Sequence, residues 1–192
     1  MLRCDLLPEV WLADETRERR QQVRLRISLG QHRAALKNQV HDQVGQHIAR
    51  QDARLKAMAR EDARGKWLAT IPGIGVYSAM ILLAEIGQVR RFSDAKALCS
   101  YAGLVPWVRE SAGHKSHGGI SRCGSPRLRW VMVEAAHTAL RCSPAARQYF
   151  DRLRQRKHAH VARVALARKL LTAAFALLRD GACFDETIFA AV

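Results

Sequence analysis

The chain has 192 residues, of which 48% are hydrophobic, and it carries a formal net charge of +15. This composition supports one compact domain with an additional arm, and the charge favours a polyanionic partner such as nucleic acid. No apolar run approaches the roughly 20 residues that span a bilayer, and the N-terminus lacks the apolar core of a signal peptide. We therefore predict a cytoplasmic protein without a membrane partner.

The positive charge is concentrated in the second half of the chain. Residues 109–169 hold 14 Lys and Arg against 3 Asp and Glu, a net charge of +11, whereas residues 1–65 hold 13 against 9, a net charge of +4. No helical segment shows a clear set of base-reading side chains. We therefore predict that this region binds double-stranded DNA through backbone phosphates.

The cysteines indicate neither a disulfide framework nor a zinc site. There are five, and no two are spaced as a C-x-x-C pair. His114, His117 and Cys123 lie close together in the sequence, but their spacing matches no familiar metal site. We predict reduced thiols and no metal site or cofactor in this chain.

Residues 16–64 are predicted to form a long helical arm, after a segment at residues 1–15 that we interpret as the remnant of a missing N-terminal domain. The arm contains no proline, and its apolar residues recur at helical spacing: Leu25, Leu29, Leu36, Val40, Val44, Ile48, Leu55 and Ala59. So narrow a stripe predicts either a long helix or helical hairpin that pairs with a partner helix, as an antiparallel or dimeric coiled coil, or a helix that lies on its own domain. We expect a homodimer or a higher oligomer. Gly30 and Gly45 are candidate break points.

A turn between two helices is predicted next, in a pattern typical of a helix-hairpin-helix. Pro72 ends the first helix, and Gly73 and Gly75 permit a tight turn. Free amides around Gly75 and Val76 would hold a DNA phosphate without reading sequence. The alternative is an ordinary turn between helices. A further short helix is expected with Ser93 as its cap and Gly103 at its end.

A glycine-rich loop follows a short apolar segment at residues 104–108. The polar stretch 110–124 is predicted to be this loop, and Ser125 followed by Pro126 predicts the start of a helix that runs to about Arg141. A helix start presents free N–H groups to anions. Arginines beside it add forked donors suited to phosphate: Arg122, Arg127 and Arg129.

Two more helices are predicted to complete an all-α fold: a long helical coiled-coil arm followed by a compact helical domain, at residues 65–192, with a helix-hairpin-helix and a Gly-rich loop. The first begins at Ser143 and Pro144, and the second runs over residues 160–179 and ends before Gly181. The first presents an outward basic face: Arg147, Arg152, Arg154, Arg156 and Lys157. Arg168 and Lys169 interrupt the apolar second helix, either as snorkelling surface residues or as phosphate ligands.

Several short motifs, in this order along the chain, resemble the C-terminal domain of the transposases of the insertion-sequence 110/116/902 group, which are related to the Piv and MooV recombinases. They are Ile71-Pro72-Gly73-Ile74-Gly75, Ala84-Glu85-Ile86-Gly87, Arg91-Phe92, Tyr101-Ala102-Gly103-Leu104-Val105-Pro106, Gly119-Ile120-Ser121-Arg122-Cys123-Gly124, Leu128-Arg129 and Ala167-Arg168-Lys169-Leu170-Leu171. Residues 16–64 are similar to the coiled-coil connector of that family.

The resemblance implies a DNA strand-transfer enzyme. Members combine a RuvC-like domain, whose four acidic residues hold Mg²⁺, with the connector and a domain that bears a nucleophilic serine, and an RNA encoded by the element guides them. Carried over by motif, the serine is Ser121. Together with residues 73, 75 and 76, the expected phosphate-binding residues are Arg122, Arg127, Arg129, Arg152, Arg154, Arg156, Arg168 and Lys169.

The acidic residues near the N-terminus do not match the family's metal-binding tetrad: Asp5, Glu9, Asp14 and Glu15. Mg²⁺ is therefore expected only with the missing N-terminal domain. An alternative is a non-catalytic DNA-binding or dimerisation fragment from a truncated transposase gene, which would bind DNA but form no covalent adduct. An RNA-binding module shares the charge signature, although no paired aromatic pattern indicates base stacking.

Overall fold

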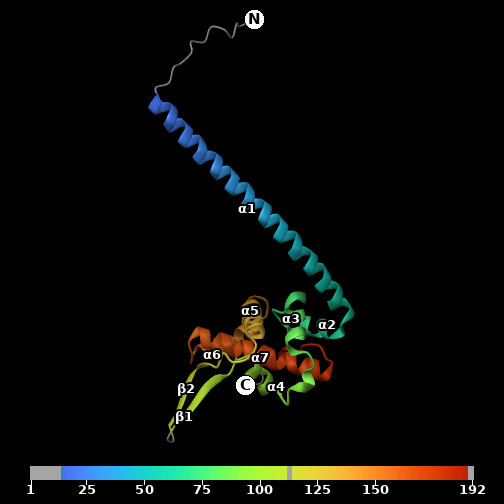
Figure 1. The fold of residues 1–192 in the computed structure, drawn as a ribbon. Coiled ribbons are helices and arrows are strands. Elements are labelled where there is room, and N and C mark those ends of the chain that lie inside the picture. The colour runs from blue at the N-terminus through green and yellow to red at the C-terminus, as the bar shows by residue number, and fades with distance from the viewer. Residues whose placement is uncertain (1–13, 112–113, 190–192) are drawn as a thin grey trace. The chain divides into compact units, whose positions relative to one another are not determined.

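The protein is described here as a computed structural model that covers residues 14–111 and 114–189, without the side chains of residues 14–15 and 108–117. The segment predicted to be a remnant, residues 1–15, therefore lies almost wholly outside the described residues. The chain divides into two compact units, one ending at Gln51 and one beginning at Asp52 (Figure 1).

The arm is one continuous helix, α1 (Asp14–Glu61). The prediction of breaks at Gly30 and Gly45 is wrong. A glycine inside an exposed helix costs about 1 kcal/mol relative to alanine, and two such residues do not interrupt a helix whose other members are mostly good helix formers. The coiled coil and the predicted domain boundaries remain predictions.

The apolar stripe of α1 is exposed to solvent. Six of its residues each keep 50% or more of their surface accessible: Leu25, Leu29, Leu36, Val40, Val44 and Ile48. A groove of about 770 Å³ runs along the same stripe between Leu29 and Val44. Within the first unit, no described residue covers it.

The second unit is helical apart from one hairpin, which confirms the all-α prediction. Its elements are α2 (Ala63–Ala69), α3 (Val76–Ile86), η2 (Val89–Arg91), α4 (Ala95–Tyr101), β1 (Pro106–Ser111), β2 (His114–Ile120), α5 (Pro126–Cys142), α6 (Pro144–Arg154), α7 (Ala159–Asp180) and η3 (Glu186–Phe189). Among the described residues, no helix is both long enough and apolar enough to cross a membrane.

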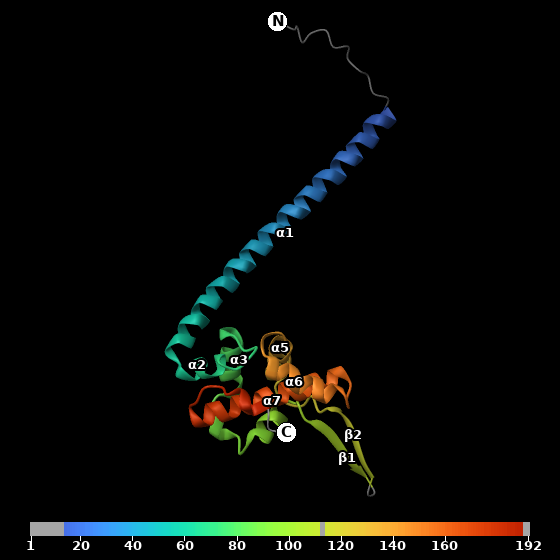
Figure 2. The ribbon, with the colours of Figure 1, turned by 180° about the vertical axis from the view of Figure 1, so that it is seen from behind.

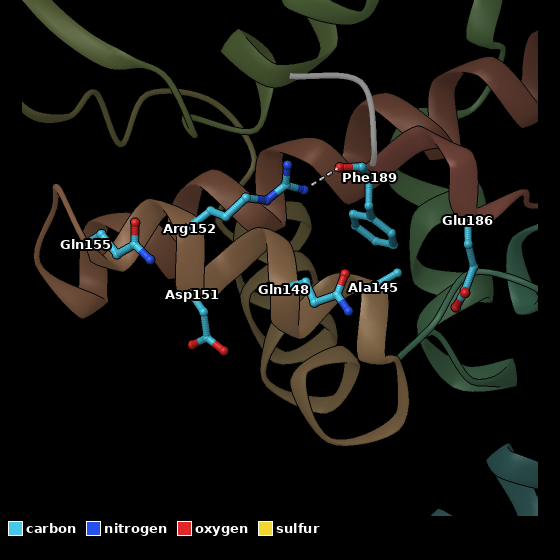
Figure 3. Close-up of a pocket in the computed structure, with 7 residues that line it drawn as sticks. All are labelled: Ala145, Gln148, Asp151, Arg152, Gln155, Glu186 and Phe189. Carbon is cyan, nitrogen blue, oxygen red and sulfur yellow. Dashed lines mark hydrogen bonds between the residues drawn. The ribbon is translucent and has the colours of Figure 1, made fainter.

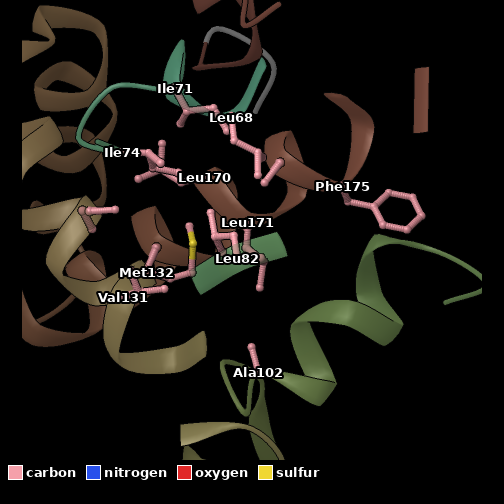
Figure 4. Packing of buried hydrophobic residues seen from close by; sticks show 14 of the residues in the cluster. Leu68, Ile71, Ile74, Leu82, Ala102, Val131, Met132, Leu170, Leu171 and Phe175 are labelled. Carbon is pink, nitrogen blue, oxygen red and sulfur yellow. The ribbon is translucent and has the colours of Figure 1, made fainter. Parts of the chain in front are cut away.

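Helix α7 forms the centre of this unit. It packs against α2, α4, α5, α6 and η2, and its buried residues extend around the helix because it has neighbours on several sides. Leu170 and Leu171 are fully buried, and they meet Leu82 of α3 and Met132 of α5 in one apolar cluster (Figure 4). The other elements are therefore fixed around a single core.

The segment predicted to be a loop at residues 110–124 is largely a β-hairpin, so that prediction is wrong. Strands β1 and β2 are antiparallel, and the register shifts between Pro106 and Val108. Both views show the two strands reaching away from the helices of the unit (Figures 1 and 2). Backbone hydrogen bonds between the strands stabilise this segment despite its polar sequence. Such pairing between strands cannot be predicted from a helical pattern of apolar residues. Among the described residues of that segment, residues 121–124 lie outside the two strands.

Most predicted helix ends are confirmed. Ser125 and Ser143 each cap a helix and accept a hydrogen bond from the N–H three residues later. Gly181 ends α7 in the left-handed conformation. The predicted cap at Ser93 is wrong: Asp94 is the cap of α4, and its carboxylate accepts a 2.7 Å hydrogen bond from the Ala97 N–H.

Candidate nucleic-acid interface

The Ser121 loop, residues 121–125, is held at both ends by backbone hydrogen bonds. The Ser121 N–H donates to the Val105 carbonyl over 2.8 Å, and the Ser125 N–H donates to the Tyr101 carbonyl over 2.9 Å. The Ser121 side chain is half-buried. The loop is thus a fixed corner between the end of α4 and the start of α5.

The backbone inside this loop adopts a conformation that needs glycine. Gly124 has a φ of +87°, and an added Cβ would overlap the Tyr101 carbonyl. Arg122 has a φ of +54°, and among the described residues it is the one residue other than glycine with positive φ. Such a backbone is rare outside glycine and is often found at functional sites. The unusual conformation directly follows Ser121.

The loop also packs closely against the end of α4. Gly103 has a φ of +65°, and a Cβ there would come within 2.5 Å of both the Cys123 carbonyl oxygen and an Arg129 guanidinium nitrogen. That guanidinium donates to the Ala102 carbonyl over 3.2 Å. Arg129 of α5 therefore ties that helix to the end of α4, beside the loop, with at least one of its donors.

The other two predicted arginines of this corner project into solvent. Arg122 is exposed, and 81% of the Arg127 side chain is exposed. A guanidinium nitrogen of Arg127 lies 3.6 Å from a Glu85 carboxylate oxygen. Because an exposed pair of this kind contributes little stability in water, Arg127 remains able to turn to another anion.

Glu85 is a residue of this corner to which the sequence analysis gave no role. Its second carboxylate oxygen accepts a 2.7 Å hydrogen bond from the Ser125 hydroxyl, and only 20% of its side chain is exposed. The signal was available in the sequence, because Glu85 is a charged residue in the strongly apolar segment 79–86. A buried charge requires a partner, but the sequence did not identify Ser125 as that partner.

The two glycines of the turn between α2 and α3 have different roles. Gly73 has a φ of +85°, and a Cβ there would overlap the Ala135 carbonyl of α5. Gly75 is the N-cap of α3 without a side-chain cap, and a Cβ there would meet nothing within 4 Å. Gly73 thus packs the turn on α5, while Gly75 and the half-exposed Val76 present the start of α3 to solvent.

Basic residues gather beside this turn. Lys56, Arg60 and Lys66 line a groove of about 440 Å³ that Val76 also borders. Lys56 and Arg60 lie at the end of α1 and were not expected to contribute here. The structure therefore supplies more positive charge near the turn than the neighbouring sequence suggested.

The turn and the Ser121 loop lie at different points along α5. Gly73 contacts the helix near Ala135, whereas Glu85 contacts its start at Ser125. Helices α3 and α5 are therefore antiparallel. With a rise of about 1.5 Å per residue, the ten residues between Ser125 and Ala135 separate the two contact points by roughly 15 Å.

The predicted basic face of α6 is only partly free. Arg152 donates a 3.0 Å hydrogen bond to the Phe189 carbonyl, beside a pocket of about 570 Å³ (Figure 3). Arg147 donates to the Leu140 carbonyl at the end of α5. Arg154 and Arg156 are exposed, so these two are the better placed for an external anion.

Arg168 and Lys169 lie on the half-buried side of α7. The Lys169 ammonium is 5.8 Å from the centre of the Tyr149 ring. Burial raises the pKa of the Tyr149 hydroxyl, while the positive charges of Arg152 and Arg168 oppose that shift. The Arg168 guanidinium of α7 thus lies near enough to Tyr149 of α6 for its charge to act on that hydroxyl.

The structure gives no support for a metal site in the described residues. Among their side chains, no three His, Cys, Asp or Glu residues come together as a possible metal site. The side chains of His114 and His117 lie outside the description. Cys123 is exposed, and its sulfur lies 3.5 Å from the Ser121 carbonyl oxygen.

Comparisons with known proteins relate this chain to transposases. A model of the family described as "Transposase IS116/IS110/IS902 family" matches residues 65–151. The "Insertion element IS110 uncharacterized 43.6 kDa protein" of Streptomyces coelicolor is 35% identical over 143 residues, which are 73% of this chain and 35% of that protein. The "Pilin gene-inverting protein" of Moraxella bovis is 36% identical over 129 residues, 65% of this chain and 40% of that protein.

A third relative matches more of the chain. The "Transposase for insertion sequence element IS1328" of Yersinia enterocolitica is 29% identical over 168 residues, which are 85% of this chain and 48% of that protein. The chain thus spans less than half the length of each of these relatives.

Proposed function

Because residues 65–151 form a domain of the IS116/IS110/IS902 transposase family, we propose that this chain acts in DNA transposition or site-specific recombination, with Ser121 as the nucleophile. Relatives named as a transposase and as a pilin gene-inverting protein support this class of reaction. The observation that carries the choice of residue is the fixed corner that begins at Ser121.

The geometry of the loop suits attack on a phosphodiester. Hydrogen bonds hold the loop ends, the backbone turns back at Arg122, and the start of α5 with Arg127 lies beside it. A phosphate that docks against these cations and the helix start would come within reach of the Ser121 hydroxyl. Preorganised positive groups of this kind stabilise the charge that develops on a transferring phosphoryl group.

The proposed step exchanges one ester for another. The Ser121 oxygen forms a bond to phosphorus and loses its proton, and the bond from phosphorus to one deoxyribose oxygen breaks. That oxygen takes up a proton and leaves as a free hydroxyl, so the DNA is held as a phosphoserine ester. A later attack by a DNA hydroxyl would reverse the exchange on another strand.

The step requires groups that the described residues do not supply. A serine hydroxyl is almost wholly protonated at neutral pH, and the metal ion expected from the family resemblance has no fitting cluster here. We therefore propose that a Mg²⁺-binding RuvC-like domain complements this chain. A guide RNA encoded by the element is a further proposed partner.

DNA is proposed to lie along the surfaces that present exposed cations or an uncapped helix start. These are the Ser121 corner, the turn at Gly75 and Val76, and the end of α6 at Arg154 together with Arg156, which follows that helix. Contact with phosphates at these points would position the duplex without reading its sequence.

A non-catalytic role in DNA binding and dimerisation is the second candidate. The exposed stripe of α1 favours it, because an apolar helix face and a basic domain suffice for such a role without chemistry. Both candidates predict DNA binding. A covalent adduct between protein and DNA separates them.

The test is formation of that adduct. The full chain is combined with the metal-binding half of a close relative, Mg²⁺, the element's RNA and labelled DNA, and the covalent product is resolved under denaturing conditions. Ser121→Ala should abolish the adduct, while Ser125→Ala, which removes a helix cap, should lower its yield without abolishing it. An adduct that survives Ser121→Ala would place the nucleophile elsewhere, and the chain alone should give none.

A further inference from the structure

Glu85 joins two helices at the point where DNA is proposed to bind. It lies in the last turn of α3, and its two carboxylate oxygens reach two different residues at the start of α5. One accepts a 2.7 Å hydrogen bond from the Ser125 hydroxyl, and the other lies 3.6 Å from a nitrogen of the Arg127 guanidinium.

The contact with Ser125 fixes the direction of a buried hydroxyl. Ser125 is only 8% exposed, and its oxygen accepts a 3.1 Å hydrogen bond from the Leu128 N–H. Because the hydroxyl hydrogen is given to Glu85, the lone pairs of that oxygen are left for the helix amide. A hydrogen bond to a carboxylate is stronger than one between neutral groups, so Glu85 secures the cap.

The same cap closes the Ser121 loop. Ser125 is the last residue of that loop, and its own N–H is bonded to the Tyr101 carbonyl. The loop is thus held through backbone bonds by Val105, which precedes β1, and by α4, and through Glu85 by α3. A change at Glu85 reaches Ser121 through this cap and not through direct contact.

The contact with Arg127 has a different character. The Arg127 side chain is largely exposed, so the pair adds little to stability. It nevertheless keeps the guanidinium near the start of α5. A negative charge at this place lowers the attraction for a phosphate, so any benefit of Glu85 to binding arises from order and not from charge.

We propose that Glu85 is a positioning residue that orders the Ser121 loop through Ser125 and keeps Arg127 beside the helix start for a DNA phosphate. This inference rests on the proposed function, because the phosphate is the one that function places there. The two parts of the proposal can be tested separately with two variants. Glu85→Ala removes both contacts, whereas Glu85→Gln keeps an acceptor for Ser125 but loses the charge that faces Arg127.

The first experiment measures amide hydrogen exchange of the full chain without DNA. Glu85→Ala should speed exchange in peptides from residues 121–128 about tenfold, as expected for the loss of one hydrogen bond to a charged group, while peptides from α7 exchange as in the wild type. Glu85→Gln should restore most of the protection. Ser125→Ala should reproduce the effect of Glu85→Ala, and Glu134→Ala, which removes an exposed acid of α5, should have none.

The second experiment measures the salt dependence of binding to a 20-base-pair duplex of arbitrary sequence. Arg127→Ala should reduce the slope of log affinity against log salt by about 1 in the wild type, as for one lost phosphate contact. In Glu85→Ala and Glu85→Gln chains the same change should have a smaller effect. In Glu85→Gln, the protection of the loop from exchange should thus return, while the effect of Arg127→Ala on the salt slope should stay small. A role of Glu85 in folding alone would not separate these two results.

Either of two results would overturn the inference: wild-type exchange of residues 121–128 in Glu85→Ala, or an equal effect of Arg127→Ala in all three backgrounds. If Glu85→Ala fails to fold, faster exchange throughout α7 will reveal it. The exchange of Glu85→Gln and Ser125→Ala then tests whether Glu85 orders the Ser121 loop. A wild-type chain that does not bind the duplex would refute the proposed function instead, and the exchange data would remain interpretable.

Discussion

The backbone N–H of Ser121 donates a 2.8 Å hydrogen bond to the carbonyl oxygen of Val105. This bond continues the ladder of the β1–β2 hairpin by one step beyond Pro106 and Ile120, which form the last pair of the strands. The position of Ser121 is therefore set by a strand register and not by a flexible loop. Substitutions that disturb the Ser121 loop should be detectable as losses of stability.

Gly124→Ala should destabilise the protein. Its φ of +87° is costly for alanine, and the added methyl group would overlap the Tyr101 carbonyl, so we expect a loss of about 1–3 kcal/mol in the free energy of unfolding. Urea denaturation measures it. Gly119→Ala is the matched control, because a Cβ there would meet nothing within 4 Å. Equal stability of the two variants would contradict the described loop backbone.

DNA affinity should fall steeply with salt. If six or more phosphates are neutralised, the log–log slope is on the order of −5, and a titration between low and physiological salt measures it. Arg154→Glu combined with Arg156→Glu should weaken binding to unrelated duplexes alike. The same reversal at Arg20 and Arg24 of α1 is the control and should have a smaller effect. A nearly flat salt dependence would exclude a contact dominated by phosphates.

The α1 stripe should associate two copies of the chain. Its apolar residues from Leu25 to Ile48 are at least half exposed, and burying them against a second helix is favourable at about 25 cal/mol per Å². Leu36→Glu with Val40→Glu should give a monomer in sedimentation. Asn38→Glu, on the opposite side of the helix, should leave the dimer intact. A wild-type chain that remains monomeric at high concentration with full helicity would favour a self-packed arm.

Asp62 should make stability depend on pH below neutrality. The Arg64 side chain holds the pKa of this N-cap carboxyl below its usual value, and the Arg64 N–H, 2.9 Å away, adds to the effect. Because the folded pKa is the lower one, the stabilisation is present above the unfolded value of about 3.9 and is lost as pH falls through the folded value. Asp62→Asn should thus be less stable than wild type at pH 7.

Urea unfolding of both proteins across this range measures the difference, which should shrink at pH 3 and below. Asp185→Asn serves for comparison, because its exposed carboxyl bonds to Thr187 and not to an arginine. A constant difference between Asp62→Asn and wild type at every pH would show that the ionised carboxyl adds nothing to the cap.

The sequence predicted those features whose hydrogen bonds span few residues. The caps at Ser125 and Ser143 and the end of α7 at Gly181 depend on bonds over three or four positions, and all three are confirmed. The wrong cap at Ser93 also concerns a choice between neighbouring residues. Ser93 and Asp94 both satisfy the cap pattern, and only the backbone direction at Asp94 decides between them.

The hairpin at residues 106–120 escaped prediction because its polar, glycine-containing sequence lacks the alternation of a half-buried strand. Pairing of β1 with β2 supplies the stability instead. The family motifs in the sequence identified Ser121 as the residue to consider, and this assignment remains a proposal.

By itself, the sequence determined a basic, all-α chain with a long helical arm, because composition and helical period are local properties. Only the tertiary structure decided what surrounds Ser121. Arg129 turned out to brace the Ala102 carbonyl, Gly73 to pack on α5, and Glu85 to hold Ser125. Each of these contacts joins residues far apart in the chain, and they form because the buried faces of α3, α4 and α5 are brought around α7 in one core, which fixes the distances between polar groups that no local pattern relates.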